Sequence, residues 1–121
     1  MPDELSILVV EDDDDIRQAI SLFLEAEGYR TVEARDGDEA LRLLRSPERF
    51  CLVLLDLFMP GKNGWEFRAE QLSDPAIADI PLIVISADRS APQKAATLGA
   101  IGCMVKPIDF SRLLDTVATH C

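Results

Sequence analysis

The chain has 121 residues, 48% of them hydrophobic, which is enough for one globular domain with a buried core. Its 22 acidic residues outnumber its 12 lysines and arginines, and the net charge of −10 repels nucleic-acid backbones and anionic lipid surfaces alike. We therefore expect a single domain over residues 1–121 that binds neither nucleic acid nor a membrane directly.

The cysteines and the N-terminal segment bear on where the protein resides. The N-terminus lacks the features of a signal peptide, and no apolar stretch approaches membrane-spanning length. Cys51 and Cys103 lie inside apolar runs, where a thiol behaves as a small hydrophobic group, and Cys121 leaves the cysteine count odd. No spacing typical of zinc ligands is present. We predict a cytoplasmic protein without disulfides.

Strand-like and helix-like patterns alternate along the whole chain. Four short apolar runs are typical of strands buried on both faces of a parallel sheet, namely residues 7–10, 51–55, 82–85 and 103–105. A further strand is expected near residues 31–34. Five such βα units predict an α/β fold with parallel strands joined by right-handed crossovers.

The expected helices are marked by apolar spacing and by end signals. The first carries an apolar face and stops at Gly28, and the second begins at Asp36 with Glu39 three residues later. A turn-rich loop over residues 59–64 precedes a helix near residues 65–72. Pro92 and Gly99 bound the fourth helix, and Asp109 caps the last. The faces expected to be buried are Ile16, Ala19, Ile20, Phe23 and Leu24 in the first helix, Ala40, Leu41 and Leu44 in the second, and Phe110, Leu113, Leu114, Val117 and Ala118 in the last.

Each of the four apolar runs ends on polar residues. Acids 11–13 follow the first run, Asp56 the second, Ser86 the third and Lys106 the fourth. Because the carboxyl ends of parallel strands meet at one edge, where open α/β folds bind ligands, these side chains are expected to converge. The sequence therefore predicts one site built from carboxylates, a hydroxyl and an ammonium group.

The acidic cluster after the first run has two interpretations. Crowded carboxylates raise one another's pKa unless a cation neutralises them, and Mg²⁺ prefers such oxygen ligands. Alternatively, acids 12–15 cap the next helix and complement its dipole. We favour the helix role for Asp14 and Asp15 and the metal role for Glu11 and Asp12.

Asp56 closes a strongly apolar run, and a carboxylate there could be a helix cap, an ion-pair partner or a nucleophile. Carboxylates attack phosphoryl centres to form aspartyl-phosphates. Ser86 can donate a hydrogen bond to a phosphoryl oxygen, and Lys106 can neutralise another. Together these residues predict phosphoryl transfer.

The chain resembles a receiver domain of the two-component response-regulator family over essentially its whole length. The resemblance is carried by residues 7–13 (ILVVEDD), 55–64 (LDLFMPGKNG), 84–87 (VISA) and 105–107 (VKP). It implies a single-domain flavodoxin-like (βα)5 fold whose five-stranded parallel sheet has the order 2-1-3-4-5.

The resemblance also implies a role for each site residue. Asp56 is the phospho-acceptor, and Glu11 and Asp12 hold Mg²⁺ together with Asp56 and the backbone carbonyl of Phe58. Ser86 and Lys106 fill the family's Ser/Thr and lysine positions, with a cis bond between Lys106 and Pro107. The phosphoryl group comes from a phosphohistidine on a partner histidine kinase or histidine phosphotransfer protein. The domain is not a conventional turnover enzyme, although it catalyses its own phosphorylation and slow dephosphorylation.

Two positions depart from the common pattern of the family. Cys103 stands where many members carry Tyr or Phe, and it is too small for the inward ring motion that accompanies the Ser/Thr shift. We therefore expect switching to depend on Ser86 and the loop after it; the alternative is that Cys103 is a core residue only. The resemblance implies that Phe58 lies beside the path of the hydrolytic water. Its apolar ring therefore predicts a long-lived phosphorylated form, an effect that Asp88 would oppose by holding a water.

The leading interpretation is a phospho-accepting switch that changes conformation to regulate an output partner. A phosphohydrolase of the aspartyl-phosphate type would carry a second Asp two residues after the nucleophile, where this chain has Phe58. A non-phosphorylated docking module of the same fold would typically lack an acid, the acceptor Asp or the Lys, all of which are present. No output domain follows the last helix, so the chain is either a stand-alone receiver or a piece of a longer protein.

Overall fold

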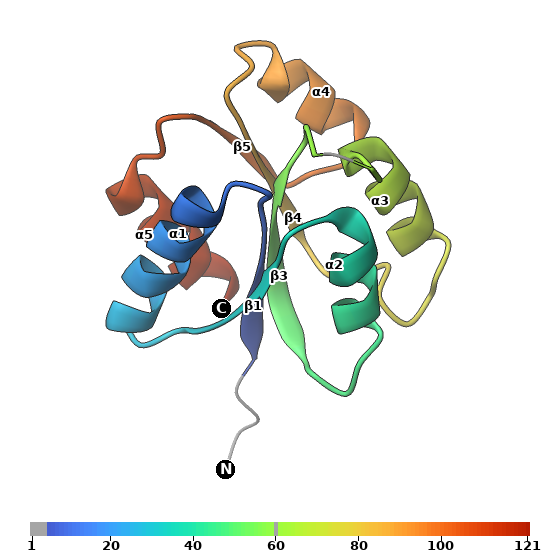
Figure 1. Ribbon diagram of the computed structural model, residues 1–121, viewed down its shortest axis with the longest axis horizontal. Helices are drawn as coiled ribbons and strands as arrows, with labels where there is room; N and C mark the ends of the chain where they lie inside the picture. Colours follow the sequence, from blue (N-terminus) through green and yellow to red (C-terminus); the bar gives the residue numbers. More distant parts are fainter. Residues whose placement is uncertain (1–4, 60) are drawn as a thin grey trace.

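The computed structural model describes residues 5–59 and 61–121, which form a five-stranded parallel sheet with helices on both faces (Figure 1). The strands are β1 (Ser6–Val10), β2 (Arg30–Ala34), β3 (Phe50–Asp56), β4 (Leu82–Ser86) and β5 (Gly102–Val105). The helices are α1 (Asp14–Ala26), α2 (Gly37–Leu44), α3 (Gly64–Leu72), α4 (Ala91–Thr97) and α5 (Phe110–His120). The strand order β2-β1-β3-β4-β5 confirms the expected flavodoxin-like fold. None of the described helices is long and apolar enough to cross a membrane.

The sheet separates two hydrophobic cores because successive side chains of a strand point to opposite faces. Leu8 and Val10 face α2, α3 and α4, whereas Ile7 and Val9 face α1 and α5. Figure 1 shows this division, with α1 and α5 together on one side of the sheet. The long apolar run of β3 is buried from end to end, as a central strand requires.

Burial is lower at the two edges of the sheet. The run at residues 103–105 was expected to be covered on both faces, but only Met104 of β5 is buried. β5 pairs with β4 alone, so its outer edge has no neighbouring strand, and Val105 remains 36% exposed. The same position at the edge explains the mixed burial of β2.

The helix ends follow the predicted signals with small shifts. The N-cap of α1 is Asp13, whose side chain accepts hydrogen bonds from the backbone N–H groups of Asp15 and Ile16. Asp14 and Asp15 occupy the first turn, where their charges favour the helix dipole. After α1, Gly28 adopts a φ of 94°, a conformation that glycine takes without steric cost.

The loop between β3 and α3 ends in a capping box. The Asn63 side chain accepts a hydrogen bond from the Glu66 backbone, and the Glu66 side chain accepts one from the Asn63 backbone. A Cβ added at Gly64 would lie 3.1 Å from the Cα of Leu57, so glycine permits this close approach. Pro60 of the predicted loop lies outside the described residues.

The last helix is covered less than its apolar pattern indicated. Leu113 and Val117 are buried and Leu114 is partly buried, but Phe110 and Ala118 are exposed. The Phe110 ring packs against Phe23 of α1, with 4.9 Å between ring centroids. α5 therefore rests on the sheet through two buried side chains and on α1 through one aromatic pair.

The expectation of a protein without disulfides is wrong. Cys51 of β3 and Cys121 after α5 form a disulfide, with their Cα atoms 5.6 Å apart, and Cys103 is the free thiol. Cys51 belongs to the core on the α1 and α5 side, and α5 runs back across this face until its end meets the strand. No local pattern indicated this approach, because the two cysteines are separated by 70 residues.

Loss of the disulfide is expected to lower the free energy of unfolding by about 2–4 kcal/mol, because the bond closes a long loop in the unfolded chain. Denaturant unfolding of the Cys121→Ser variant should show this loss, and dithiothreitol should bring the wild type to the same midpoint. Equal midpoints for oxidised and reduced wild type would contradict the prediction.

Candidate functional site

The register of the sheet brings the predicted site residues to one edge. Val10 pairs with Leu55, so Glu11 follows its strand beside Asp56. Asp56 pairs with Ile85 and Ser86 with Val105, so Ser86 and Lys106 complete the row. Residues that are widely separated in sequence thus become neighbours at the carboxyl ends of β1, β3, β4 and β5.

Three carboxylates form the floor of the site. Glu11, Asp12 and Asp56 each offer an oxygen, and these oxygens lie within 4.8 Å of one another. Glu11 and Asp56 are buried, with 3% and 7% exposure, whereas Asp12 reaches solvent. A set of close carboxylate oxygens with one open side fits a hard cation such as Mg²⁺, which retains part of its water shell.

Lys106 provides the positive charge that these acids need. Its Nζ donates to Glu11 Oε1 at 2.5 Å and to Asp56 Oδ2 at 3.5 Å. Burial by itself lowers the pKa of Lys106, but the hydrogen bond to Glu11 and the charges of both acids raise it above its ordinary value. The expected cis bond between Lys106 and Pro107 is present. Lys106 therefore remains an ammonium group beside Asp56.

Asp56 is held by the chain that follows it. The backbone N–H of Phe58 donates to Asp56 Oδ1 at 3.2 Å, and Leu57 between them is fully buried. The Phe58 ring is half exposed and packs edge-on against Trp65 of α3, 5.9 Å between centroids. The carboxylate is thus fixed by one backbone donor and one ammonium group.

A residue that the sequence analysis did not single out supports the acidic loop. Arg17 of α1 is buried, and its Nη1 donates to the backbone carbonyl of Glu11 at 2.9 Å. Its other nitrogens bind Asp14 at 2.6 Å and Glu33 of β2 at 2.9 Å. Burial alone lowers the pKa of Arg17, but these two carboxylates raise it. The i,i+3 spacing of Asp14 and Arg17 was the available signal, although it indicated only a surface pair.

Ser86 and Asp88 form the opposite side of the site. Ser86 is fully buried, and its Oγ accepts a hydrogen bond of 3.1 Å from the backbone N–H of Asp88. The Asp88 carboxylate accepts from the backbone N–H and hydroxyl of Ser90, both at 2.8 Å, and pairs with Lys94 of α4. The bond to Lys94, followed by those from Ser90, lowers the pKa of Asp88 to about 2. Both of its carboxylate oxygens are therefore engaged by protein groups.

Cys103 is partly buried and lines a groove between α4 and α5. The groove has a volume of about 480 Å³, and small residues such as Ala95, Ala96 and Gly102 line it together with Arg112. Burial raises the pKa of the Cys103 thiol, although Arg112 opposes this shift.

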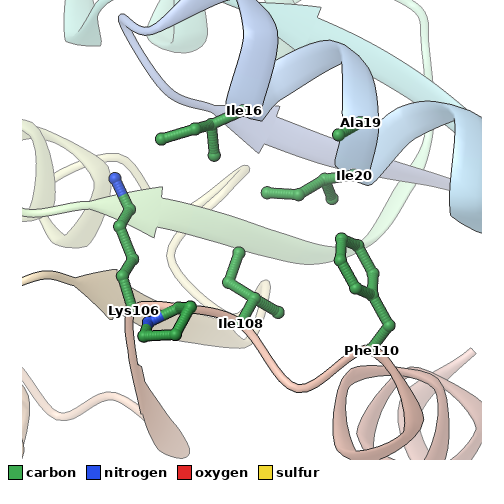
Figure 2. Close-up of a pocket in the computed structure, with 7 residues that line it drawn as sticks. Ile16, Ala19, Ile20, Lys106, Ile108 and Phe110 are labelled. Atoms are coloured by element: carbon green, nitrogen blue, oxygen red, sulfur yellow. The ribbon is translucent and has the colours of Figure 1, made fainter.

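A second groove adjoins Lys106 on the side of α1. It has a volume of about 450 Å³ and an almost wholly apolar lining: Ile16, Ala19, Ile20, Pro107, Ile108 and Phe110, with Lys106. Figure 2 shows Lys106 at one end and Phe110 at the other, facing the α1 side chains. An apolar surface therefore leads directly to the charged site.

Comparison with known proteins agrees with this geometry. A family model described as the response regulator receiver domain matches residues 7–118. The CAI-1 autoinducer sensor kinase/phosphatase CqsS of Vibrio cholerae is 38% identical over 118 residues, which are 95% of this chain and 17% of that protein. The transcriptional regulatory protein AfsQ1 of Streptomyces coelicolor is 36% identical over 113 residues, which are 91% of this chain and 48% of that protein. The chain thus spans less than half the length of these two relatives.

Solved structures agree as well. The chemotaxis protein CheY4 of Vibrio cholerae has a TM-score of 0.87 and 29% identity, with 98% of this chain and 100% of that one covered. The response regulator TrrA of Thermotoga maritima, solved in complex with Mg²⁺-BeF, has a TM-score of 0.83 and 30% identity, with 97% and 99% covered.

The fold and the acidic site define a phospho-accepting signalling domain of the α/β class. The chain belongs to the response regulator receiver domain family, in which phosphorylation and Mg²⁺ binding are general properties.

The ionised Asp12 carboxylate is expected to lower the stability of the folded state when no cation is bound. Burial, followed by the hydrogen bond and charge of Glu11, raises the pKa of Asp12, so the folded state binds a proton more tightly than the unfolded chain. Stability then falls as the pH rises through this pKa. Asp12→Asn should raise Tm at pH 7 by about 1–3 °C without Mg²⁺, as expected for an exposed charge interaction. In excess Mg²⁺ the wild type should have the higher Tm, because Asp12 then binds the cation. A Tm of Asp12→Asn below that of the wild type both with and without Mg²⁺ would contradict the prediction.

Proposed function

We propose that this domain takes a phosphoryl group from a phosphohistidine onto Asp56 with the help of Mg²⁺, and thereby switches an output partner. The observation that carries the proposal is the sheet register, which sets a buried Asp56 between Glu11 and Lys106. The donor is a histidine kinase or a histidine phosphotransfer protein, in keeping with the similarity to part of a sensor kinase. We place this exchange in the cytoplasm.

The transfer follows from the chemistry of the site residues. A carboxylate oxygen of Asp56 attacks the phosphorus, the new O–P bond forms, and the N–P bond of the phosphohistidine breaks with its electron pair returning to the imidazole. Lys106, already charged, lies beside the acceptor and neutralises a phosphoryl oxygen. Glu11, Asp12, Asp56 and the backbone carbonyl of Phe58 would hold Mg²⁺, which would supply further positive charge opposite the phosphoryl oxygens.

Ser86 is the residue that senses the phosphoryl group in this proposal. Its hydroxyl is buried at the same edge and accepts a hydrogen bond from Asp88, so its proton is available to a phosphoryl oxygen. The phosphoryl group adds about two negative charges, which draw Ser86 toward it and displace the loop that follows. Switching without an aromatic ring at position 103 is consistent with this route.

A receiver-like docking module that is never phosphorylated is the second candidate. It is less well supported, since Asp56, Lys106 and the two acids that follow β1, Glu11 and Asp12, are all present and close together. A phosphohydrolase is disfavoured because Phe58 stands where such an enzyme carries its second Asp.

Incubation with Mg²⁺ and acetyl phosphate is expected to add one phosphoryl group, measured as intact-protein mass. The adduct should vanish in Asp56→Asn and when Mg²⁺ is removed by chelation. A wild-type protein that binds Mg²⁺ but gains no mass would support the docking module, and steady phosphate release without an adduct would support the enzyme.

Phe58→Asn is expected to shorten the lifetime of the phosphorylated form several-fold. An apolar ring hinders and desolvates the attacking water, whereas a polar side chain orients it. The decay of the mass adduct after removal of acetyl phosphate measures this lifetime. Phe58→Leu serves as the control, since it keeps an apolar side chain, and an unchanged decay in Phe58→Asn would refute the argument.

A further inference from the structure

The Phe58 ring, next to the acceptor, is held between two helices. On one side it meets Trp65 in the first turn of α3, with an interplanar angle of 63°. On the other side the Nζ of Lys94, from α4, lies 5.1 Å from the ring centroid, within the range of a cation–π interaction. Although the ring is 51% exposed, its position is therefore defined by two specific contacts.

Lys94 is in turn held by the loop that follows Ser86. Its ammonium pairs with the Asp88 carboxylate, which also accepts two hydrogen bonds from Ser90. The backbone N–H of Asp88 binds the Ser86 hydroxyl at 3.1 Å. A continuous set of contacts thus leads from the α4 lysine to the hydroxyl of the phosphoryl site.

The same contacts return to the acceptor by a second route. The backbone N–H of Phe58 donates to Asp56 Oδ1, so ring and acceptor belong to one short segment. The successive contacts begin and end in the phosphoryl site, in the order Asp56, Phe58, Lys94, Asp88 and Ser86. Lys94 is its only member from a helix, and it joins the two loops.

We propose that Lys94 is a positioning residue for the phosphoryl site, holding the Phe58 ring beside the acceptor and coupling that ring to Ser86 through Asp88. The proposal rests on the proposed function, since it concerns the lifetime and the signal of phosphorylated Asp56. In this arrangement the ring that responds to phosphorylation is at position 58, and Cys103 needs no part in it.

The coupling has a direct physical basis. When the Ser86 hydroxyl moves toward a phosphoryl oxygen, its bond from the Asp88 backbone weakens, and Asp88 shifts with the loop. Lys94 follows its counter-ion, because both oxygens of Asp88 are already bound within this loop and helix. The ring then follows its cation and changes its packing on Trp65.

Trp65 is the only tryptophan of the chain, so its emission reports on this ring. We expect Mg²⁺ with beryllofluoride, a phosphoryl mimic, to change the emission of the wild type and of Lys94→Arg, which keeps the charge. In Lys94→Met the change should fall by at least half. The phosphorylated form of that variant should decay about two- to fivefold faster, the range that an exposed cation–π contact implies.

Lys62→Met is the matched control. Lys62 is another partly buried lysine with two acidic partners, Asp38 and Glu70, which lie on α2 and α3 and not on the loop after Ser86. It should leave both readouts unchanged. In a Phe58→Leu background, Lys94→Met should have no further effect on lifetime, because the cation then has no ring to hold.

The outcomes separate the two claims. Lys94→Met that takes up the phosphoryl group but matches the wild type in emission and decay would overturn the role of Lys94 alone. Equal effects of Lys94→Met with and without Phe58 would overturn it as well, since the lysine would then act elsewhere. A wild type that never forms the Asp56 adduct would instead overturn the proposed function.

Discussion

The contact between one ammonium group and the buried acids at the sheet edge is the constraint on which the rest depends. Lys106 lies between Glu11 and Asp56, two carboxylates with almost no access to water. Buried charges of one sign are costly unless they are paired, so the fold must deliver a cation to this point. The parallel register of β1, β3, β4 and β5 does so, because it aligns the carboxyl ends of the strands in one row.

Charge also shapes the supports of the site. Arg17 reaches the backbone of Glu11 from α1, and Asp88 binds Lys94 across the loop before α4. Each pairs a loop that carries site residues with a helix that packs on the sheet. In the proposed function, a phosphoryl group on Asp56 would add further negative charge to a site where three carboxylates already face one ammonium group. Position 103 carries no aromatic side chain, whereas the Phe58 ring lies only two residues after Asp56.

Most of the strands, the helix ends and the convergent site were predictable, because each depends on residue types that are close together in the sequence. The apolar runs ending on Asp56, Ser86 and Lys106 indicated buried strands and one convergent site, and the N-cap and glycine signals placed the helix ends to within a residue or two. The prediction of two-sided burial failed at β5, because an edge is a property of the whole sheet. Arg17 was missed for a similar reason: its partner on Glu11 is a backbone carbonyl, which no side-chain pattern reveals.

The sequence by itself thus determined the fold class, the family resemblance and the residues able to carry phosphoryl chemistry, since these depend on periodicity and on residue type. Only the tertiary structure decided which groups meet across the fold. The disulfide joins residues 70 positions apart, and Lys94 of α4 reaches Phe58 in the loop after β3. Such contacts depend on how α4 and α5 pack on the sheet. The order of residues in the chain does not by itself show which side chains of distant elements come into contact.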